Sequence, residues 1–269
     1  MRMIKKFVRS KYFMPLVWTL ILIAVWELFA TIVQYTQRSP ENFLPHIHGI
    51  LASVVSGKKV NGTQTAFQMV MQNAGATLSR ALLGFAVGAL TGVLLALLMS
   101  VFDTVEKIAF PYLMLIQVIP VLGLAPIILA LTGDIGVSRI VIAAILTFYP
   151  VAANTLAGFR SVEREKYELM YSYAGSRRQF YVKTMFPACV PYLFTGLKIA
   201  APMAVTASIL VDTLQGGVGL GCLLSQSLKG AMTRYVFWQI VVLSAVVGVL
   251  SFVAIGWIQK LVCPYARKR

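Results

Sequence analysis

The stretch SVEREKYELMYSYAGSRRQFYVKTMFPACVP, residues 161–191, decides how this chain is organised, because it is strongly charged and lies between long apolar segments. Together with the preceding Arg160, it carries six basic and three acidic side chains. Charged groups at this density are costly to bury, so the stretch must lie in water.

The same stretch carries the signals of an ordered helix. Glu163 and Glu165 suit a first helical turn, where the positive end of the helix dipole favours carboxylates. An apolar face follows at helical spacing, formed by Tyr167, Met170, Tyr171 and Ala174. The pattern therefore predicts a short amphipathic helix.

A second helix is predicted directly after the first. The pair Ala174-Gly175 breaks the first helix, and Ser176 with Gln179 has the S-x-x-Q form of a capping box that begins another. We expect Pro187 and Pro191 to close the segment before the next apolar run. Two short helices on the cytoplasmic side of a membrane protein predict a docking surface for a soluble partner.

The rest of the chain has the composition of an integral membrane protein. Hydrophobic residues make up 58% and charged residues only 12%, which excludes an ordinary soluble domain. An apolar span of about twenty residues is enough to cross a bilayer core of roughly 30 Å. Six such spans are predicted, at about 14–34, 77–100, 108–131, 138–158, 192–213 and 236–259. We expect an all-α, polytopic protein with six transmembrane helices, in which residues 1–269 form one transmembrane domain and the first span is an uncleaved anchor.

The distribution of basic residues predicts the orientation. Of the 24 Lys and Arg residues, 16 lie in the two tails, at Lys107 or in 160–183, and six lie in the segments of the opposite side. Cytoplasmic loops carry the excess of Lys and Arg, so both termini and the loop at 159–191 are expected to be cytoplasmic. The net charge of +15 reflects this bias rather than nucleic-acid binding.

Two features of the apolar regions predict packing rather than chemistry. The small residues in LLGFAVGALTGVLLALL, at 82–98, are typical of close helix packing. On the outer side, a helix is expected near 47–56 at the interface, and the segment 215–234 is expected to re-enter the membrane in part.

The chain lacks the side-chain groupings of an enzyme. Its nine acidic residues lie mostly at span ends or in loops, and its three cysteines have no C-x-x-C spacing. His46 and His48 form an H-x-H pair that lacks further ligands, so no metal site is predicted. No strand precedes the GGVGLG run at 216–221 and no Lys-Ser/Thr follows it, which argues against a nucleotide site. We expect neither a catalytic site nor a cofactor on this chain.

Three residues within the spans have candidate roles in transport. Pro120 and Pro126 each remove a backbone donor and interrupt one helix twice, either to line a transport site or only as a packing kink. Asp212 lies at the outer end of its span, where a carboxylate must be paired or hydrated. A gate or pathway role for Asp212 is favoured over a plain helix-end charge.

The charged segment resembles the coupling loop of ABC importer permeases of the binding-protein-dependent inner-membrane family. Glu168-Leu169-Met170 stands where the family has E-A-A, Ala174 falls at the family glycine with Gly175 one residue later, and Phe186-Pro187 matches the closing L-P. The order A-G-S replaces the usual G-A-S, which puts the fine geometry of the turn in doubt.

The resemblance extends over about residues 76–225, which we take as the permease core. ATLSRALLGFAVGALTG is similar to the entry into the family's core, and IPVLGLAPIILALTG followed by FYPVAANTLAGFRSV is similar to the nitrate/sulfonate/taurine branch. Val211-Asp212 stands where that branch has A-E near the outer end of the fifth span, and VGLG at 218–221 resembles the G-L-G that follows.

The resemblance implies a type I ABC importer permease in the bacterial cytoplasmic (inner) membrane. Such a permease pairs with a second copy, docks an ATPase subunit that binds ATP and Mg, and receives solute from an extracytoplasmic binding protein. Docking to the ATPase is expected to use Tyr167, Met170 and Tyr171 as knobs, Arg177 and Arg178 at the rim, and Glu168, Ala174, Gly175 and Pro187. The translocation pathway or gate is expected to include Gln117, Pro120, Met203, Thr206, Ser208 and Asp212.

The substrate implied by this branch is a small solute: sulfonate, taurine, nitrate, or a pyrimidine or vitamin-precursor heterocycle. Two other classes of protein remain as alternatives. An ion-coupled secondary transporter should show paired charges at mid-membrane and often inverted repeats. A membrane-embedded enzyme should show a convergent cluster of ionisable groups.

Overall fold

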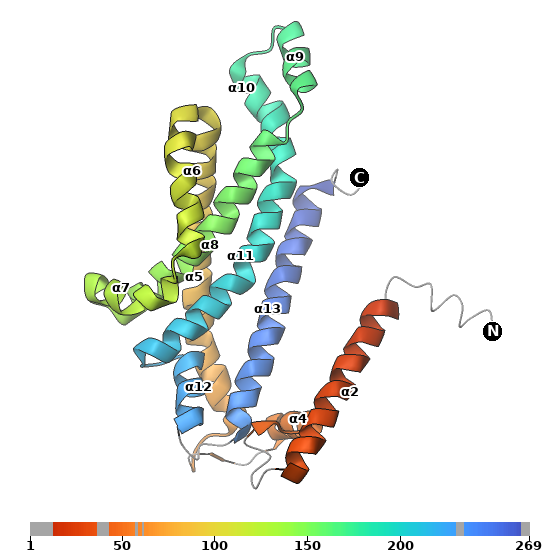
Figure 1. Ribbon diagram of the computed structural model, residues 1–269, viewed down its shortest axis with the longest axis vertical. Helices are drawn as coiled ribbons and strands as arrows, with labels where there is room; N and C mark the ends of the chain where they lie inside the picture. Colours follow the sequence, from red (N-terminus) through yellow and green to blue (C-terminus); the bar gives the residue numbers. More distant parts are fainter. Residues whose placement is uncertain (1–12, 37–42, 57–58, 61, 230–233, 265–269) are drawn as a thin grey trace, which may run out of the picture.

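A computed structural model describes residues 13–36, 43–56, 59–60, 62–229 and 234–264 of the chain (Figure 1). These residues form helices joined by short connections, with one isolated β-bridge between Lys59 and Thr65. In chain order the elements are α2 (Phe13–Thr36), α4 (Ile47–Val55), α5 (Ala66–Val101), α6 (Asp103–Val118), the 3₁₀ helix η1 (Val121–Leu124), α7 (Ala125–Thr132), α8 (Ile135–Arg160), α9 (Arg164–Ser172), α10 (Arg177–Phe180), the π-helical η2 (Tyr181–Met185), α11 (Phe186–Gln215), α12 (Leu220–Lys229) and α13 (Arg234–Val262).

Within the part of the chain that the structure describes, five helices are long and apolar enough to cross a membrane, and they confirm five of the predicted spans. They are α2, α5, α8, α13 and the continuous run from α10 through η2 to α11. The remaining predicted span, 108–131, is not one helix, so the total of six transmembrane helices is not confirmed.

Pro120 explains why that span is broken. The helix α6 ends at Val118, and Ile119 has an extended backbone with ψ 128°, as expected for a residue that precedes proline. After η1, α7 begins at Ala125 with Pro126 in its first turn, where a missing N–H costs nothing. The two prolines therefore cause one interruption rather than the two predicted. Figure 1 shows α7 turned away from the axis of α6.

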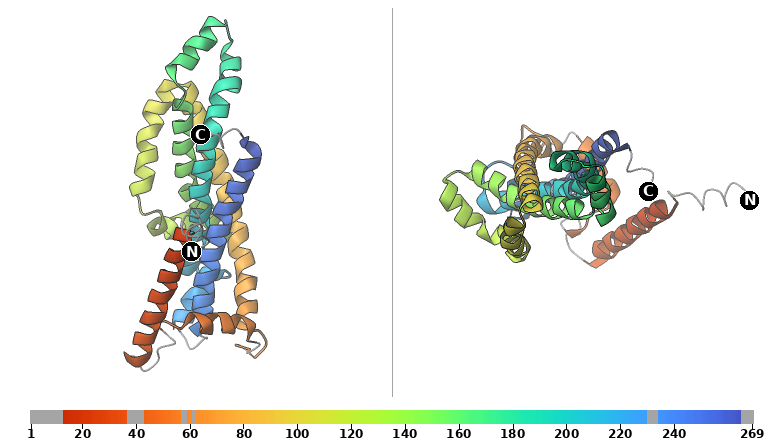
Figure 2. Two further views of the ribbon diagram at one scale, coloured as in Figure 1. Left: turned by 90° about the vertical axis from the view of Figure 1, so that its right-hand side faces the viewer. Right: turned by 90° about the horizontal axis from the view of Figure 1, so that it is seen from above.

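The centre of the bundle is formed by α5, α8 and α11 (Figures 1 and 2). The glycines of α5 allow α8 to approach closely: a Cβ on Gly84 would lie 2.5 Å from Ala143 Cβ, and one on Gly88 would lie 2.4 Å from the Ala144 carbonyl oxygen. Gly92 makes a similar approach to α8. This confirms that the small residues of 82–98 serve helix packing.

The two ends of the bundle carry different elements. Helices α9 and α10 project beyond the spans at one end, and α4 and α12 lie at the opposite end (Figure 1). The predicted helix near 47–56 is confirmed as α4. In the segment 215–234, α12 folds back onto the bundle through Leu220 and Leu223, which pack with Val70, Val236 and Ile240. Both chain termini, residues 1–12 and 265–269, lie outside the described residues.

One prediction about the charged segment is wrong. Pro187 and Pro191 do not close it but lie inside α11, which continues from α10 and η2 without a break. A proline ring crowds the carbonyl of the residue four positions earlier, which for Pro187 is Lys183 in η2. The wider π turn gives the ring room, so the helix can pass through the proline.

Candidate coupling hairpin and buried ion pair

The α9–α10 hairpin is built as its sequence predicts. Glu163 occupies the N-cap position of α9. The capping box of α10 is complete: the Gln179 N–H donates to Ser176 Oγ at 3.3 Å, and the Ser176 N–H donates to Gln179 Oε1 at 2.9 Å. The Gly175 N–H donates to the Met170 carbonyl at 2.9 Å, which closes the turn between the helices.

The residue of this turn with a left-handed backbone is Ala174 rather than Gly175. Ala174 has φ 50°, in the left-handed region that favours glycine. Ala174 is also the position that matches the glycine of the coupling-loop motif. The departure from the motif thus leaves the turn intact but strains one alanine.

We expect Ala174→Gly to stabilise the turn by about 1 kcal/mol, because glycine adopts the left-handed conformation without the Cβ clash. Ala174→Val should destabilise it, since a β-branched side chain worsens the clash. Hydrogen exchange of the α9 and α10 amides should slow in the first variant and accelerate in the second. Equal exchange in all three proteins would contradict the strain at Ala174.

The apolar residues on one face of α9 differ in how far they are exposed. The Tyr167 ring packs on Phe180 of α10, with ring centroids 4.2 Å apart, and burial raises the pKa of the Tyr167 phenol above its usual value. Met170 contacts Gly175 inside the turn. Tyr171, by contrast, is 87% exposed. A pocket of about 450 Å³ lies between the hairpin and the α5 end; its lining includes Tyr167, Met170, Tyr171, Gly175 and Arg177.

The charged residues of the hairpin remain at the surface. Glu168 pairs with Arg164 one turn earlier, with Glu168 Oε1 3.1 Å from Arg164 Nε, and both side chains are exposed. Arg177 and Arg178 are exposed in the first turn of α10. Pro187 is partly buried at the start of α11, further from the tip of the hairpin.

At the opposite end of the bundle, Asp212 of α11 is completely buried. Its Oδ1 lies 3.0 Å from Nε of Arg139, which is 1% exposed on α8, and 3.5 Å from Nη1 of the partly exposed Arg80 on α5. Its Oδ2 accepts a hydrogen bond of 2.6 Å from the Thr77 hydroxyl. One carboxylate therefore joins the three central helices.

The glycine-rich run at 216–221 is folded against this ion pair. Arg139 donates to the carbonyls of Gly216 and Val218. The Leu220 N–H donates to Thr77 Oγ1 at 2.8 Å. A Cβ on Gly219 would lie 2.1 Å from Asp212 Oδ2, so only glycine fits against the carboxylate. The run is a close-packed cover for a buried charge, not a phosphate loop.

Sequence reasoning missed Arg139, which it placed among the solvated basic residues of one side. The structure buries Arg139 in the second turn of α8. The available signal was its position at the edge of an apolar span, since a charge there requires a partner.

The structure does not gather the predicted pathway residues into one site. Gln117, Pro120, Met203 and Thr206 are exposed on the single chain. Ser208 is buried and donates to the Thr77 carbonyl at 3.1 Å, so it belongs with Asp212 at the contact of α5 and α11.

Long apolar helices around a packed centre define the class as a polytopic membrane protein, and this one carries a charged helical hairpin beyond one end of the bundle. The chain belongs to the family of binding-protein-dependent transport system inner membrane components, whose model matches residues 65–263. It is therefore a transport subunit of the ABC permease class, from a family of the bacterial inner membrane.

Named relatives agree with this assignment. The chain is 30% identical to the formylaminopyrimidine transport permease protein of Halalkalibacterium halodurans, over 95% of this chain and 96% of the relative. It is 24% identical to a nitrate import permease of Synechocystis, over 96% and 92%, and 25% identical to the taurine transport permease of Escherichia coli, over 91% and 86%. These relatives confirm the resemblance to the nitrate/sulfonate/taurine-like branch.

Solved structures agree on the fold. An inward-facing form of the MetNI methionine ABC transporter matches with a TM-score of 0.61 at 17% identity, over 72% of this chain and 96% of that one. An amino acid ABC transporter matches with a TM-score of 0.58 at 17% identity, over 72% and 92%. These likenesses support the importer permease architecture.

Proposed function

We propose that this chain is the membrane-spanning permease of an ATP-driven importer for a small solute delivered by a binding protein. The observation that carries the proposal is the α9–α10 hairpin, which projects beyond the spans of a chain from this family (Figure 1). Its capped, rigid turn suits the transmission of a movement from a soluble subunit. No observation on the described residues favours an ion-coupled secondary transporter.

The hairpin is proposed as the docking site for an ATPase subunit that binds ATP and Mg itself. Tyr171 is the most exposed of the predicted knobs, and Tyr167, Met170 and Tyr171 all line the pocket between the hairpin and the end of α5. Arg177 and Arg178 supply charge at the rim. A second permease copy and an extracytoplasmic binding protein complete the proposed transporter, with both termini and the hairpin in the cytoplasm.

The substrate is proposed to be a small polar solute of the kind named in the relatives. Formylaminopyrimidine, nitrate and taurine are named there, and the first belongs to the relative with 30% identity over almost the whole chain. Gln117, Pro120, Met203 and Thr206 are proposed to line the path between two copies, because each is exposed on the single chain. Asp212 is proposed to act on the gate indirectly, by holding the 216–220 segment in place.

We expect Glu168→Arg to abolish coupling while the membrane domain stays folded. The exposed pair with Arg164 contributes only about 0.5 kcal/mol, so its loss cannot unfold the hairpin. A partner surface that complements the negative charge of Glu168 would repel an arginine at this position, and such repulsion costs several kcal/mol of binding free energy. The measurement is co-purification of the ATPase subunit from native membranes in mild detergent, followed by solute uptake in reconstituted vesicles.

Lys166→Glu is the matched control, because it also reverses a charge on α9 and breaks one surface pair, with Glu163. Two residues along a helix rotate the side chain by about 200°, so Lys166 points to a different face from Glu168. The control should retain the ATPase and transport. Normal uptake by Glu168→Arg, with its ATPase bound, would show that the hairpin is not the docking site.

A further inference from the structure

Among the described residues, the first spanning helix, α2, contacts the rest of the protein near α4. Figure 1 shows α2 standing apart from the bundle except at its end near α4, and most of its side chains are exposed. Near α4, Trp26 of α2 donates from its ring N–H to the Pro45 carbonyl at 3.1 Å and packs edge-on against Trp238 of α13, with ring centroids 5.0 Å apart. An interaction that stabilises this contact between α2 and α4 therefore holds α2 in position.

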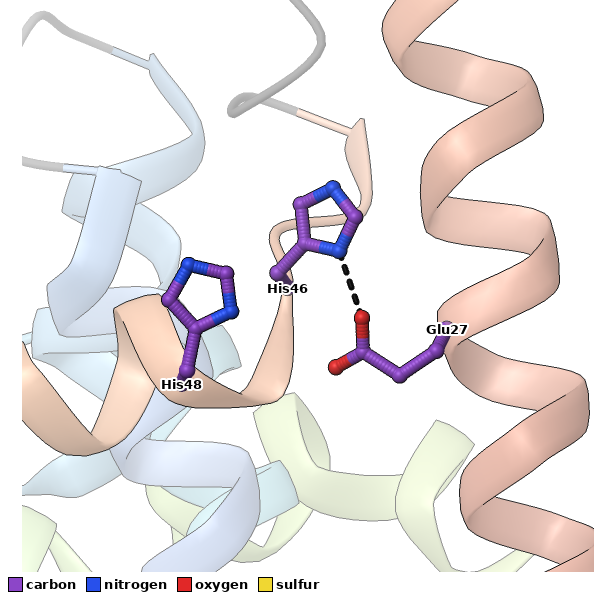
Figure 3. A group of neighbouring side chains, drawn as sticks. All are labelled: Glu27, His46 and His48. Carbon is purple, nitrogen blue, oxygen red and sulfur yellow. Dashed lines mark hydrogen bonds and ion pairs between the residues drawn. The ribbon is translucent and has the colours of Figure 1, made fainter.

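Three side chains with metal-binding atoms lie together at this contact between α2 and α4 (Figure 3). Glu27 comes from α2, and His46 and His48 come from the N-terminus of α4. Each offers one ligand atom, and the three atoms lie within 4.8 Å of one another. The two imidazole rings are stacked, with centroids 5.3 Å apart. Figure 3 shows both rings and the carboxylate turned toward a common space between α2 and α4.

The hydrogen bonds around the cluster leave a place for a cation. His46 Nε2 lies 3.0 Å from the carbonyl oxygen of the Gln34 side chain, which accepts the Nε2 proton. The neutral ring then presents a lone pair at Nδ1, which faces Glu27 Oε2 at 2.5 Å. Two acceptors this close must share a cation: a proton fits at this distance, and a metal ion fits once the two atoms have moved apart.

Two further observations favour a metal ion over a proton alone. A proton needs only Glu27 and His46, yet His48 is also turned to the same space, and its ring nitrogens have no hydrogen-bond partner among the described residues. The second carboxylate oxygen of Glu27 accepts the Ile47 N–H at 2.9 Å, which holds the carboxylate in place. Hydrogen bonds that orient ligands in this way, as they do for Glu27 and His46, are characteristic of metal sites.

We propose that Glu27, His46 and His48 bind one divalent transition-metal ion, with Zn²⁺ as the best-fitting candidate. Two imidazoles and one carboxylate form a ligand set that Zn²⁺ accepts, and water would fill its fourth position. Two ligands of such an ion lie about 3.4 Å apart, so Oε2 and Nδ1 must separate by about 1 Å when the ion enters. The bound ion would add a metal link between α2 and α4 to the contacts that His46 already makes with Glu27 and Gln34 of α2.

The test is Zn²⁺ binding to the purified full-length chain, measured by competition with a chelating dye and by elemental analysis after dialysis. The chain has only two histidines, so a tag without histidine is essential. We expect one Zn²⁺ per chain and a rise in the unfolding temperature on addition of Zn²⁺, with no response to Mg²⁺ or Ca²⁺, which prefer oxygen ligands.

His48→Ala is the decisive variant, because His48 is exposed and its loss leaves the Glu27–His46 contact unchanged. We expect Zn²⁺ affinity to fall by more than about tenfold and the thermal response to disappear. Glu27→Gln should weaken binding similarly, whereas Gln64→Ala, which removes a partly buried side chain whose amide donates to Gln72, should bind as the wild type does. Absence of Zn²⁺ binding by the wild type, or equal binding by His48→Ala, would overturn the site and leave a shared proton as the cation. Neither result depends on transport activity.

Discussion

Asp212→Ala is expected to destabilise the protein by about 3–5 kcal/mol, the usual cost of leaving one member of a buried ion pair without its partner. The guanidinium of Arg139 is 1% exposed and would lose its counter-charge. The Thr77 hydroxyl and the 216–220 segment, which are organised around the same carboxylate, would lose their anchor as well. Equilibrium unfolding in mixed micelles measures the change.

The double variant Asp212→Ala/Arg139→Met separates the loss of the pair from the loss of packing. It removes both charges and keeps a long apolar side chain at position 139, so it should be more stable than Asp212→Ala alone. Arg80 has access to solvent and can remain charged in both variants. If Asp212→Ala unfolds at the same denaturant concentration as the wild type, the carboxylate does not hold the three helices together.

Gly88→Val is expected to prevent the native contact of α5 with α8. A Cβ at Gly88 would lie 2.4 Å from the Ala144 carbonyl oxygen and 2.8 Å from Thr147 Cβ, and neither atom belongs to a flexible side-chain end. The helices must separate to admit it, so the cost should exceed the 1–3 kcal/mol, roughly, of an ordinary overpacked core. Little folded protein should be recovered after mild detergent extraction and size-exclusion chromatography.

Gly75→Val provides the matched control on the same helix. A Cβ at Gly75 meets nothing within 4 Å, so this substitution carries the same helix-propensity change without the clash. It should yield folded protein at wild-type levels. Similar recovery of both variants would mean that α5 and α8 are not in close contact.

Local patterns in the sequence determined much of this protein. Five of the spans follow from apolar length alone, and the hairpin follows from the charged segment with its Ser176–Gln179 capping box. Such signals are readable because the residues involved are neighbours along one helix or one turn. The same segment also carries the resemblance that identified the family.

Helix boundaries near prolines were predicted less accurately from the sequence, because the effect of a proline depends on its surroundings. Pro120 breaks a helix, whereas Pro126, Pro187 and Pro191 are accommodated. Pro126 falls in a first turn and Pro187 follows a π turn, and neither circumstance can be read from the residue itself.

Only the tertiary structure decided which polar groups meet. Thr77 and Asp212 are 135 residues apart, and Glu27 and His46 are joined across two different helices. The sequence marks Asp212 as a carboxylate that must be paired or hydrated, but no local signal in any of these segments states which residue is the partner. These side chains come together because apolar and glycine surfaces pack closely and bring the helices into contact. A charge buried by that packing can then pair only with the residue that lies opposite it.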